Sequence, residues 1–178
     1  MRDFSRERLR RRYRPAQVRL LFIGEAPPAS GKFFYRQDSG LYRAMRDAFR
    51  MLDPAITDGG FLAAFQNLGC YLIDACPQPV DQLDAKARRE ACRASEPSLA
   101  RAIQGLQPDA IATLVRSIRG NVERATALAE WTGPLIDLPY PGRWVRHREA
   151  FLSALVPRLS ALTGNAVPVP ERRYRAGS

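Results

Sequence analysis

The sequence predicts an α/β fold, a three-layer sandwich in which helices cover both faces of a central parallel sheet of about four strands. Short apolar runs rich in β-branched residues alternate with longer segments in which apolar residues recur at helical spacing. The chain has 178 residues, of which 46% are hydrophobic. This is enough for one continuous core and too little for two, so we expect one globular domain.

Both ends of the chain differ from this pattern. Residues 1–15 carry seven arginines, show no apolar periodicity and end at Pro15. We interpret them as a flexible basic arm, which either lies on DNA phosphates or remains a frayed, solvated terminus. The α/β domain then spans residues 16–163. Residues 164–178 predict an irregular tail, because glycines and prolines interrupt them.

In the first half of the domain two strands enclose two helices. The predicted strands are residues 18–23 and 70–75, and the predicted helices are residues 38–52 and 60–67. The first strand, VRLLFI, is short and apolar, and Gly24 ends it abruptly. Asp38 or Ser39 caps the first helix, whose apolar residues fall on one face.

The second half of the domain repeats this alternation. Two helices at residues 84–94 and 96–106 are separated near Ser95, and strands follow at residues 109–115 and 134–138. Between these strands a helix has an apolar face formed by Ile118, Val122, Ala125 and Leu128. A last helix follows the fourth strand, with an apolar face formed by Leu152, Leu155, Val156, Leu159 and Leu162.

Ligands of such sheets bind beyond the carboxyl ends of the strands, which selects the loops at residues 24–36, 74–82 and 139–146. The first loop, GEAPPASGKFFYR, does not fit a phosphate-binding loop. Six residues separate its glycines where that loop has four, and Phe33 stands where a metal-binding Ser or Thr is needed. It also lacks the three-glycine dinucleotide fingerprint. The sequence therefore predicts neither ATP nor NAD as a cofactor.

The same loop contains residues that suit a planar ligand. Glu25 places a carboxylate at a strand end, and two prolines stiffen the backbone that follows. Phe33, Phe34 and Tyr35 come next, and a flat ligand stacks on such rings. Aromatic residues of a loop also commonly fold back into the core, and we expect at least one of these three to do so.

The charge of the chain indicates a polyanionic partner. Its 28 basic residues outnumber its 18 acidic ones and give a net charge of +10. All of the basic residues except Lys32 and Lys86 are arginines, which suit bidentate contacts with phosphate. Such a composition also keeps a chain soluble, so the charge supports nucleic-acid binding without proving it.

Several cations near the three loops are candidate phosphate contacts. Lys32 and Arg36 belong to the first loop, Arg116 and Arg119 follow the third strand, and Arg146 ends the last loop. Each of them either contacts a DNA strand or belongs to a solvated surface.

A metal site is not predicted. The three cysteines, Cys70, Cys76 and Cys92, form no CxxC pair, and His147 is the single histidine. The chain therefore lacks a ligand set for tetrahedral zinc, and we expect free, buried thiols.

Two further patterns bear on location. No stretch approaches the ~18 consecutive apolar residues of a membrane-spanning helix. The N-terminus is charged where a signal peptide needs an apolar centre. We therefore expect a cytoplasmic protein that makes no contact with a membrane. If it acts on DNA, we expect it to be associated with the nucleoid.

Three motifs resemble those of the uracil-DNA glycosylase superfamily, particularly its branches with a GEAPG motif. A strand followed by GEAPP, a Phe-containing segment and GLYRAMRDAF is similar to the first motif. YLIDACPQPV is similar to the segment where these enzymes have a strand, an Asn and a Cys-Pro or Arg-Pro turn. LPYPGRWVRHREAF is similar to the last motif, usually His-Pro-Ser before a DNA-penetrating loop and a helix. The three motifs stand in the right order and span most of residues 18–156.

The resemblance implies an enzyme of base excision DNA repair. Such an enzyme flips a damaged base out of the DNA, stacks it on a Phe and releases it by cleaving the N-glycosidic bond. The resemblance implies that Phe34 or Phe33 is the stacking platform. It further implies that Asp74 reads the edge of the base and that Glu25 lines the site of the attacking water.

Other positions depart from the family's pattern. Ala26 stands where the best-known branch has its catalytic Asp, and we expect it to line the base pocket; Asp38 is the nearest later carboxylate and a catalytic candidate. Tyr140 stands where His is usual, so a phenol replaces the group that steadies the departing base. Arg143 or Trp144 would fill the gap that the base leaves in the duplex.

The GEAPG branches also commonly carry a four-cysteine iron–sulfur cluster. The three cysteines of this chain lack that spacing and argue against such a cluster, so we expect no cofactor.

At the second motif Asp74 replaces the usual Asn. An amide both donates and accepts hydrogen bonds, whereas an ionised carboxylate only accepts. Recognition of uracil needs both, so Asp74 suits a base that presents donors, and the base stays open between uracil and another deaminated or modified base.

We therefore expect a DNA glycosylase that acts as a monomer on single- or double-stranded DNA. Two other functions remain open. One is a nucleic-acid-binding module that has kept the fold and lost the chemistry, and the other is a hydrolase of free nucleosides or nucleotides.

Overall fold

The computed structural model describes residues 4–142 and 144–164. At its centre lies a parallel sheet of four strands in the order β2-β1-β3-β4. The strands are β1 (Leu20–Gly24), β2 (Cys70–Asp74), β3 (Ala110–Thr113) and β4 (Leu135–Asp137). Each overlaps a strand expected from the sequence, and the four-stranded parallel sheet is confirmed.

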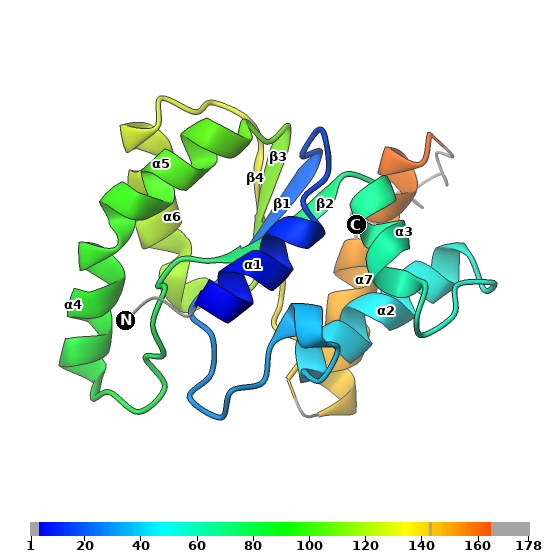
Figure 1. Ribbon diagram of the computed structural model, residues 1–178, viewed down its shortest axis with the longest axis horizontal. Coiled ribbons are helices and arrows are strands. Elements are labelled where there is room, and N and C mark those ends of the chain that lie inside the picture. Colours follow the sequence, from blue (N-terminus) through cyan, green and yellow to red (C-terminus); the bar gives the residue numbers. More distant parts are fainter. Residues whose placement is uncertain (1–3, 143, 165–178) are drawn as a thin grey trace, which may run out of the picture.

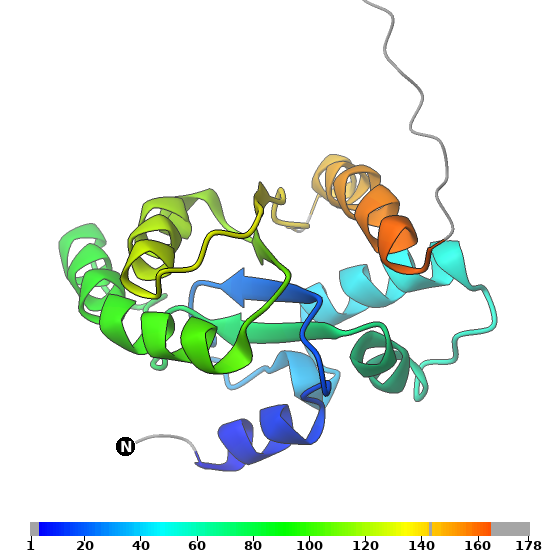
Figure 2. The same cartoon turned by 90° about the horizontal axis from the view of Figure 1, so that it is seen from above.

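Helices lie on both sides of this sheet. The described residues form α1 (Phe4–Arg12), α2 (Gly40–Leu52), α3 (Phe61–Asn67), α4 (Ala85–Ala94), α5 (Glu96–Leu106), α6 (Arg119–Leu128) and α7 (Val145–Leu162), with short 3₁₀ helices η1 (Phe34–Arg36) and η2 (Arg116–Ile118). Helices α4, α5 and α6 gather on one side and α2, α3 and α7 on the other (Figures 1 and 2). This arrangement confirms the predicted three-layer α/β sandwich.

Local sequence explains where two of these helices begin. The Ser39 hydroxyl accepts a hydrogen bond from the Tyr42 amide at 3.1 Å and caps α2. The Asp84 carboxylate accepts from two amides of the first turn of α4, at 2.8 and 2.9 Å. Of the two caps expected for α2, Ser39 is therefore the one formed. Leu128, expected on the apolar face of α6, is instead 57% exposed and is the last residue of the helix.

The N-terminal segment differs from the flexible arm expected from the sequence. Residues 4–12 form helix α1, which lies outside both helix layers, beside the edge strand β2 (Figures 1 and 2). The helix lacks an apolar stripe, so tertiary contacts that periodicity does not reveal hold it in place. Arg10 binds Asp74, and Tyr13 stacks on Tyr35 with ring centres 5.7 Å apart. The Gln66 side-chain amide donates to the backbone carbonyls of Arg12, which ends the helix, and of Arg14. Residues 165–178, which hold nearly all of the predicted tail, lie outside the described residues.

An aromatic cluster in the core fixes the end of the first loop. Phe34 lies among the rings of Tyr35, Tyr42, Phe61 and Phe65, with centroid separations of 5.0 to 6.1 Å. The Tyr35 hydroxyl donates to the Leu72 carbonyl at 3.1 Å and accepts from its amide at 2.8 Å. Burial raises the pKa of Tyr35 well above its ordinary value, so it stays a neutral phenol. The loop is thereby anchored to the backbone of β2.

The register of the strands brings the predicted motifs together. Gly24, the last residue of β1, pairs with Asp74, the last residue of β2. On the other side of β1, β3 ends at Thr113, which pairs with Asp137 of β4. All four carboxyl ends therefore meet at one edge of the sheet, where the rule for open α/β sheets places a ligand.

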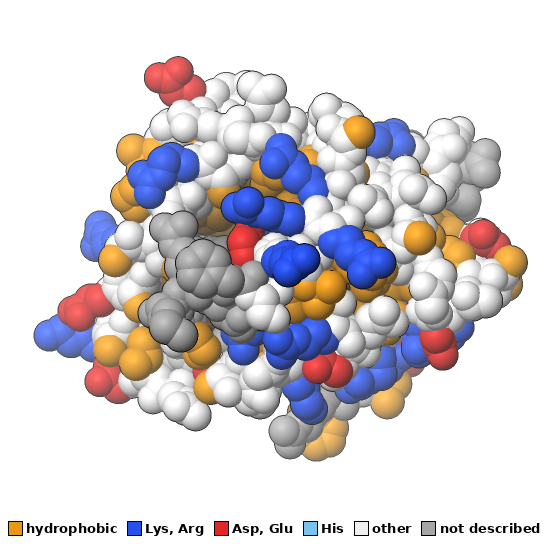
Figure 3. All heavy atoms as spheres, in the orientation of Figure 1, with side chains coloured by type: hydrophobic (Ala, Val, Ile, Leu, Met, Phe, Trp, Pro, Cys, Tyr) orange, Lys and Arg blue, Asp and Glu red, His pale blue; other side chains and the backbone are white. Residues whose placement is uncertain are grey.

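The last two features concern the charge of one face and the apolar character of the helices. Lys and Arg side chains gather across the middle of the face that carries α1 (Figure 3). Within the described part of the chain, no helix combines the length and the apolar character that crossing a membrane requires.

Candidate active site

A cavity of about 400 Å³ opens at the carboxyl edge of the sheet. The loops that follow β1, β3 and β4, together with β2 itself, contribute to its wall. The predicted site residues that line it are Glu25, Ala26, Lys32, Phe33, Phe34, Asp74 and Tyr140. Residues from the first loop, from the end of β2 and from the last loop thus share one cavity, which we call the base cavity after the ligand that the sequence leads us to expect.

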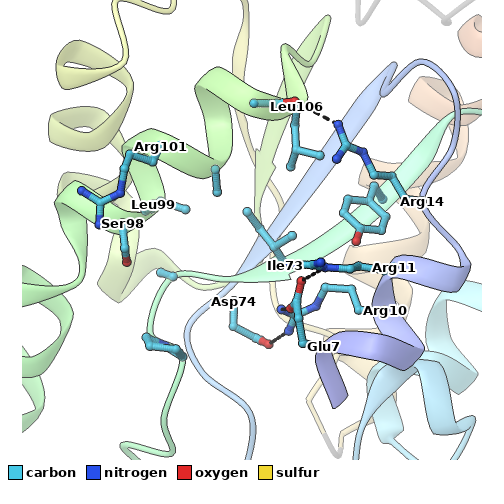
Figure 4. Close-up of a pocket in the computed structure, with 15 residues that line it drawn as sticks. Glu7, Arg10, Arg11, Arg14, Ile73, Asp74, Ser98, Leu99, Arg101 and Leu106 are labelled. Atoms are coloured by element: carbon cyan, nitrogen blue, oxygen red, sulfur yellow. Dashed lines mark hydrogen bonds and ion pairs between the residues drawn. The ribbon is translucent and has the colours of Figure 1, made fainter. Parts of the chain in front are cut away.

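Asp74 lines the base cavity and is held by an arginine of the N-terminal helix. Its Oδ2 atom accepts a hydrogen bond from Arg10 Nη2 at 2.6 Å (Figure 4). The two side chains are only 10% and 16% exposed, so the ion pair is largely buried. The other oxygen, Oδ1, lies beside Gly24, where a Cβ would stand only 3.2 Å from it. The close approach of the two strand ends therefore favours glycine at position 24.

Opposing effects act on the charge of Asp74. Burial raises the pKa of this carboxyl above its usual range, while the guanidinium groups of Arg10 and Arg6 oppose that rise. The short ion pair with Arg10 is the geometry of the ionised form. Arg10 thus helps to keep a buried carboxylate charged.

The Arg10 guanidinium also contacts the aromatic side of the base cavity. Its central carbon lies 5.5 Å from the centre of the Phe33 ring, a cation–π distance. Its Nη1 atom donates to Glu7 Oε2 at 3.0 Å, within α1. One side chain therefore connects α1 to a carboxylate and to a ring that line the cavity.

Glu25, the second carboxylate of the cavity, has its own arginine. Arg88 Nε donates to Glu25 Oε1 at 2.8 Å, and Arg88 Nη2 donates to Oε2, so the pair is bidentate. These hydrogen bonds raise the pKa of Arg88 above its ordinary value. Glu25 is 13% exposed and Arg88 41% exposed, which places the carboxylate inside and the guanidinium at the rim. Arg88 comes from the first turns of α4, which Asp84 caps.

The two phenylalanines of the cavity wall are both buried. Phe34 is fixed on several sides by edge-on aromatic contacts, whereas Phe33 lies between Tyr35 and the Arg10 guanidinium. The expectation that at least one aromatic residue of this loop belongs to the core holds for Tyr35, which is 2% exposed. A rigid ring at the cavity wall can support a planar ligand without losing side-chain entropy.

Asp38 does not line the base cavity. Its Oδ1 atom accepts a hydrogen bond from the Phe33 amide at 2.7 Å. The carboxylate therefore stabilises the conformation of the loop that carries the phenylalanines, which is a structural contact rather than a contact with the cavity.

The last loop carries two exposed aromatic residues, Tyr140 and Trp144, of which Tyr140 lines the base cavity. Tyr140 lines it and is half exposed, and the partial burial of its ring raises its pKa, so it is present as a phenol. Trp144, just before α7, is 64% exposed. Arg143 lies outside the described residues. Trp144 does not line the base cavity, and its exposure makes its ring available to a partner.

The other predicted phosphate contacts are spread over the surface. Arg36 is exposed and donates to the Gly31 carbonyl at 3.3 Å. Arg116 in η2 and Arg146 in α7 are exposed and do not line the base cavity. Of these cations only Lys32 reaches the cavity wall.

The cysteines do not fit a four-cysteine cluster. Cys76 and Cys92 lie with their Sγ atoms 3.0 Å apart, whereas Cys70 belongs to the main core. Burial raises the pKa of Cys76 to about 12, so its thiol stays protonated and is a poor metal ligand. Within the described ranges, no group of three or more His, Cys, Asp or Glu side chains is arranged to hold a metal ion.

Sequence reasoning missed Arg10 and Arg88. They lie 64 and 63 residues away from the carboxylates they bind, and each stands in a segment with many other arginines. Nothing in the local pattern distinguishes them from solvated surface cations. The signal that selects them is tertiary: each is the arginine whose side chain reaches a carboxylate at a strand end.

Comparison with known proteins agrees with the motifs seen in the cavity wall. Residues 11–166 match the model of one protein family, described as the Uracil DNA glycosylase superfamily. The matched range holds all four strands and every described residue of the base cavity. A search of curated proteins found no match.

Proposed function

The chain belongs to the uracil DNA glycosylase superfamily, and from this membership we propose that it binds a base flipped out of DNA and hydrolyses its N-glycosidic bond. The observation that supports this most is the composition of the base cavity. Two buried carboxylates, Glu25 and Asp74, face one space with Phe33 and Phe34. A flipped base needs a stacking surface and a polar group at its edge, and its hydrolysis needs a group that orients water.

We assign the reading of the base to Asp74. Arg10 occupies its Oδ2 atom, which leaves Oδ1, beside Gly24, for a ligand. An ionised carboxylate accepts hydrogen bonds and does not donate them. The substrate that fits is therefore a modified base that presents donors to Oδ1, such as an amino group, in preference to uracil, whose O4 acceptor an ionised carboxylate cannot satisfy.

The chemical step follows from the same groups. The base stacks on Phe34, whose ring the aromatic core holds, and the bond between its nitrogen and the C1′ carbon of the sugar breaks as positive charge develops on the sugar. The Glu25 carboxylate stabilises this charge and accepts a proton from the water whose oxygen bonds to C1′. The Tyr140 phenol donates a hydrogen bond to the departing base, which leaves with the bonding electron pair and takes a proton from solvent.

One observation favours a second candidate, a nucleic-acid-binding module without catalysis. Both carboxylates already form ion pairs, with Arg10 and Arg88, and the bidentate pair with Arg88 occupies both oxygens of Glu25. A binder would retain the stacking surface and the basic face and leave every lesion intact.

The first test is a gel-based cleavage assay on oligonucleotides that carry uracil, hypoxanthine, xanthine or an alkylated base. We expect cleavage of one lesion by the unaltered protein and a loss of about 100-fold or more in Glu25→Gln. Glu90→Gln is the matched control, because it removes an exposed carboxylate from the helix that carries Arg88. In Asp74→Asn we expect uracil cleavage to rise, since the amide supplies the missing donor.

The assay separates the candidates. No cleavage of any lesion, with DNA binding intact, would establish the binding module and reject hydrolysis. Cleavage that survives unchanged in Glu25→Gln would remove Glu25 from the mechanism, and a substrate preference that Asp74→Asn leaves unchanged would remove Asp74 from base recognition.

A further inference from the structure

A second cavity, of about 530 Å³, lies next to the base cavity. Asp74 belongs to the walls of both. Four arginines line the second cavity, so we call it the arginine cavity: Arg10, Arg11, Arg14 and Arg101. Arg10 and Arg11 come from α1, Arg14 follows that helix, and Arg101 projects from α5 on the opposite wall (Figure 4).

The charges of this cavity do not balance. Its two carboxylates are Glu7 and Asp74, and they pair with Arg10 and Arg11. Arg14 donates one hydrogen bond, to the Gly105 carbonyl at 2.9 Å, which leaves its charge uncompensated. Two positive charges, those of Arg14 and Arg101, therefore remain.

Donor groups are in excess as well. No described residue forms an ion pair or hydrogen bond with Arg101, which is exposed. The Nε atom of Arg10 is buried and finds no hydrogen-bond partner among the described atoms. A buried donor without a partner costs free energy, and a bound anion recovers it. Guanidinium groups bind phosphate oxygens through paired N–H donors, which makes phosphate the anion that suits this set.

The position of the arginine cavity relates it to the nucleic-acid strand that would supply the flipped base. Ile73, Asp74 and Ala75, at the carboxyl end of β2, form one part of its wall. From there the cavity extends to Arg14 and Gly105, which precede β1 and β3. The rest of the wall is largely apolar and includes Leu99 and Leu106 of α5. Because Asp74 belongs to both walls, a nucleic-acid strand with one base in the base cavity can place an adjacent phosphate in the arginine cavity.

We propose that the arginine cavity binds a backbone phosphate of the nucleic-acid strand whose flipped base occupies the base cavity. The proposal rests on the function proposed above and adds a role for the basic N-terminal segment. The sequence of this segment leaves two alternatives open, a terminus that lies on DNA phosphates or a frayed end. The proposal selects the first. Arg14 and Arg101, the two arginines whose charge no carboxylate balances, supply the positive charge for this contact.

The test measures binding of an undamaged oligonucleotide, single-stranded and duplex, so that the readout does not depend on cleavage. In Arg101→Gln we expect affinity for the oligonucleotide to fall about tenfold at low salt. The slope of log K against log salt should decrease by about 0.7 for the single strand and about 0.9 for the duplex, the loss of one phosphate contact. Arg101→Lys keeps the charge and should retain the slope.

The matched control is Arg158→Gln, which removes one exposed charge from α7, outside both cavities. Arg14→Gln serves as a second cavity variant. Because Arg101 is exposed and makes no contact that the fold needs, its variant should unfold at the same urea concentration as the unaltered protein. Equal affinities and slopes in Arg101→Gln, Arg14→Gln and Arg158→Gln would overturn the proposal.

A free nucleotide carries the same phosphate chemistry as a strand, and a second arm of the experiment distinguishes them. Titration with a deoxynucleoside monophosphate should show weak binding. Arg101→Gln should reduce the affinity for this nucleotide by no larger factor than it reduces the affinity for the oligonucleotide. Loss of nucleotide binding alone, with oligonucleotide binding unchanged, would overturn the assignment to a strand. Arginine-dependent strand binding without cleavage of any lesion would contradict the proposed hydrolysis and leave the phosphate site standing.

Discussion

At the scale of single residues, the base cavity contains two carboxylates, and each of them forms an ion pair with its own arginine. Arg10 and Arg88 reach Asp74 and Glu25 from segments more than sixty residues away in the chain. Removing one partner of a buried ion pair leaves the other charge uncompensated, which costs more than the intact pair contributes. The Arg10–Asp74 pair is the more buried of the two, so its loss should affect stability as well as recognition.

Arg10→Gln should destabilise the protein in a pH-dependent way. Burial raises the pKa of Asp74 in the folded state, and Arg10 opposes this rise, so the variant should have a still higher pKa. A carboxyl whose folded pKa exceeds its unfolded value of about 3.9 loses stability as the pH rises from the unfolded value through the folded one. We expect Arg10→Gln to cost about 3 kcal/mol at pH 8 and much less at pH 4. Urea unfolding at the two pH values measures the difference.

Arg11→Gln is the control for this prediction. Arg11 is 74% exposed and pairs with Glu7 on the surface of α1, so its loss should cost less than about 1 kcal/mol at either pH. A loss of stability in Arg10→Gln that is the same at pH 4 and pH 8 would show that titration of Asp74 plays no part in it.

At the scale of elements, helix α4 contributes one residue, Arg88, to the wall of the base cavity. Arg88 stands one turn after Asp84, whose carboxylate caps the helix by accepting hydrogen bonds from the Lys86 and Ala87 amides. A cap that fixes the first turn also fixes the direction from which Arg88 approaches Glu25. The local sequence of α4 and the geometry of the cavity are linked in this way.

Asp84→Ala should therefore weaken both stability and catalysis. Loss of the cap should lower the free energy of unfolding by about 1 kcal/mol. A frayed first turn should displace Arg88 and lower kcat about tenfold with a smaller change in KM, because misplaced groups near a reacting centre slow the chemical step more than binding. Asp84→Asn keeps a capping side chain and should retain both properties. A variant that loses stability and keeps kcat would separate the cap from the site.

At the scale of the whole molecule, both cavities include Asp74 at the carboxyl edge of the sheet, and basic side chains gather on the face that carries α1 (Figure 3). The net charge of +10 favours approach to a polyanion over a large distance. This arrangement suits a strand that lies across the edge of the sheet better than a free nucleoside, which occupies one cavity and has little use for a charged face.

Salt dependence and the exposed Trp144 test this view together. Affinity for duplex DNA should fall steeply and linearly in log K against log salt, whereas a hydrolase of free nucleosides should be almost indifferent to salt. Trp144→Ala should weaken duplex binding about tenfold and leave stability unchanged, because the side chain is 64% exposed. Met51→Ala, at an apolar position of α2 that is 62% exposed, should change neither. Equal effects of the two substitutions would remove Trp144 from the DNA contact.

The sequence by itself determined the layers of this fold and the order of its elements. Buried strands, amphipathic helices and caps are local patterns of hydrophobicity and hydrogen bonding, so the segments around β1 to β4 and α2 to α7 can be recognised without knowing their neighbours. The rule for parallel sheets then places the loops that carry Glu25, Asp74 and Tyr140 at one edge, and the register of Gly24 with Asp74 agrees with it.

Only the tertiary structure decided which cations belong to the site. Helix α1 has no apolar stripe, and Arg10 resembles the arginines beside it until the fold brings it to Asp74. The same holds for Arg88 and for the arginine cavity, whose four members come from two segments far apart in the chain. The physical reason is range: hydrophobic periodicity is read over a few neighbouring residues, whereas the partner of a buried charge is set by the packing of the whole chain.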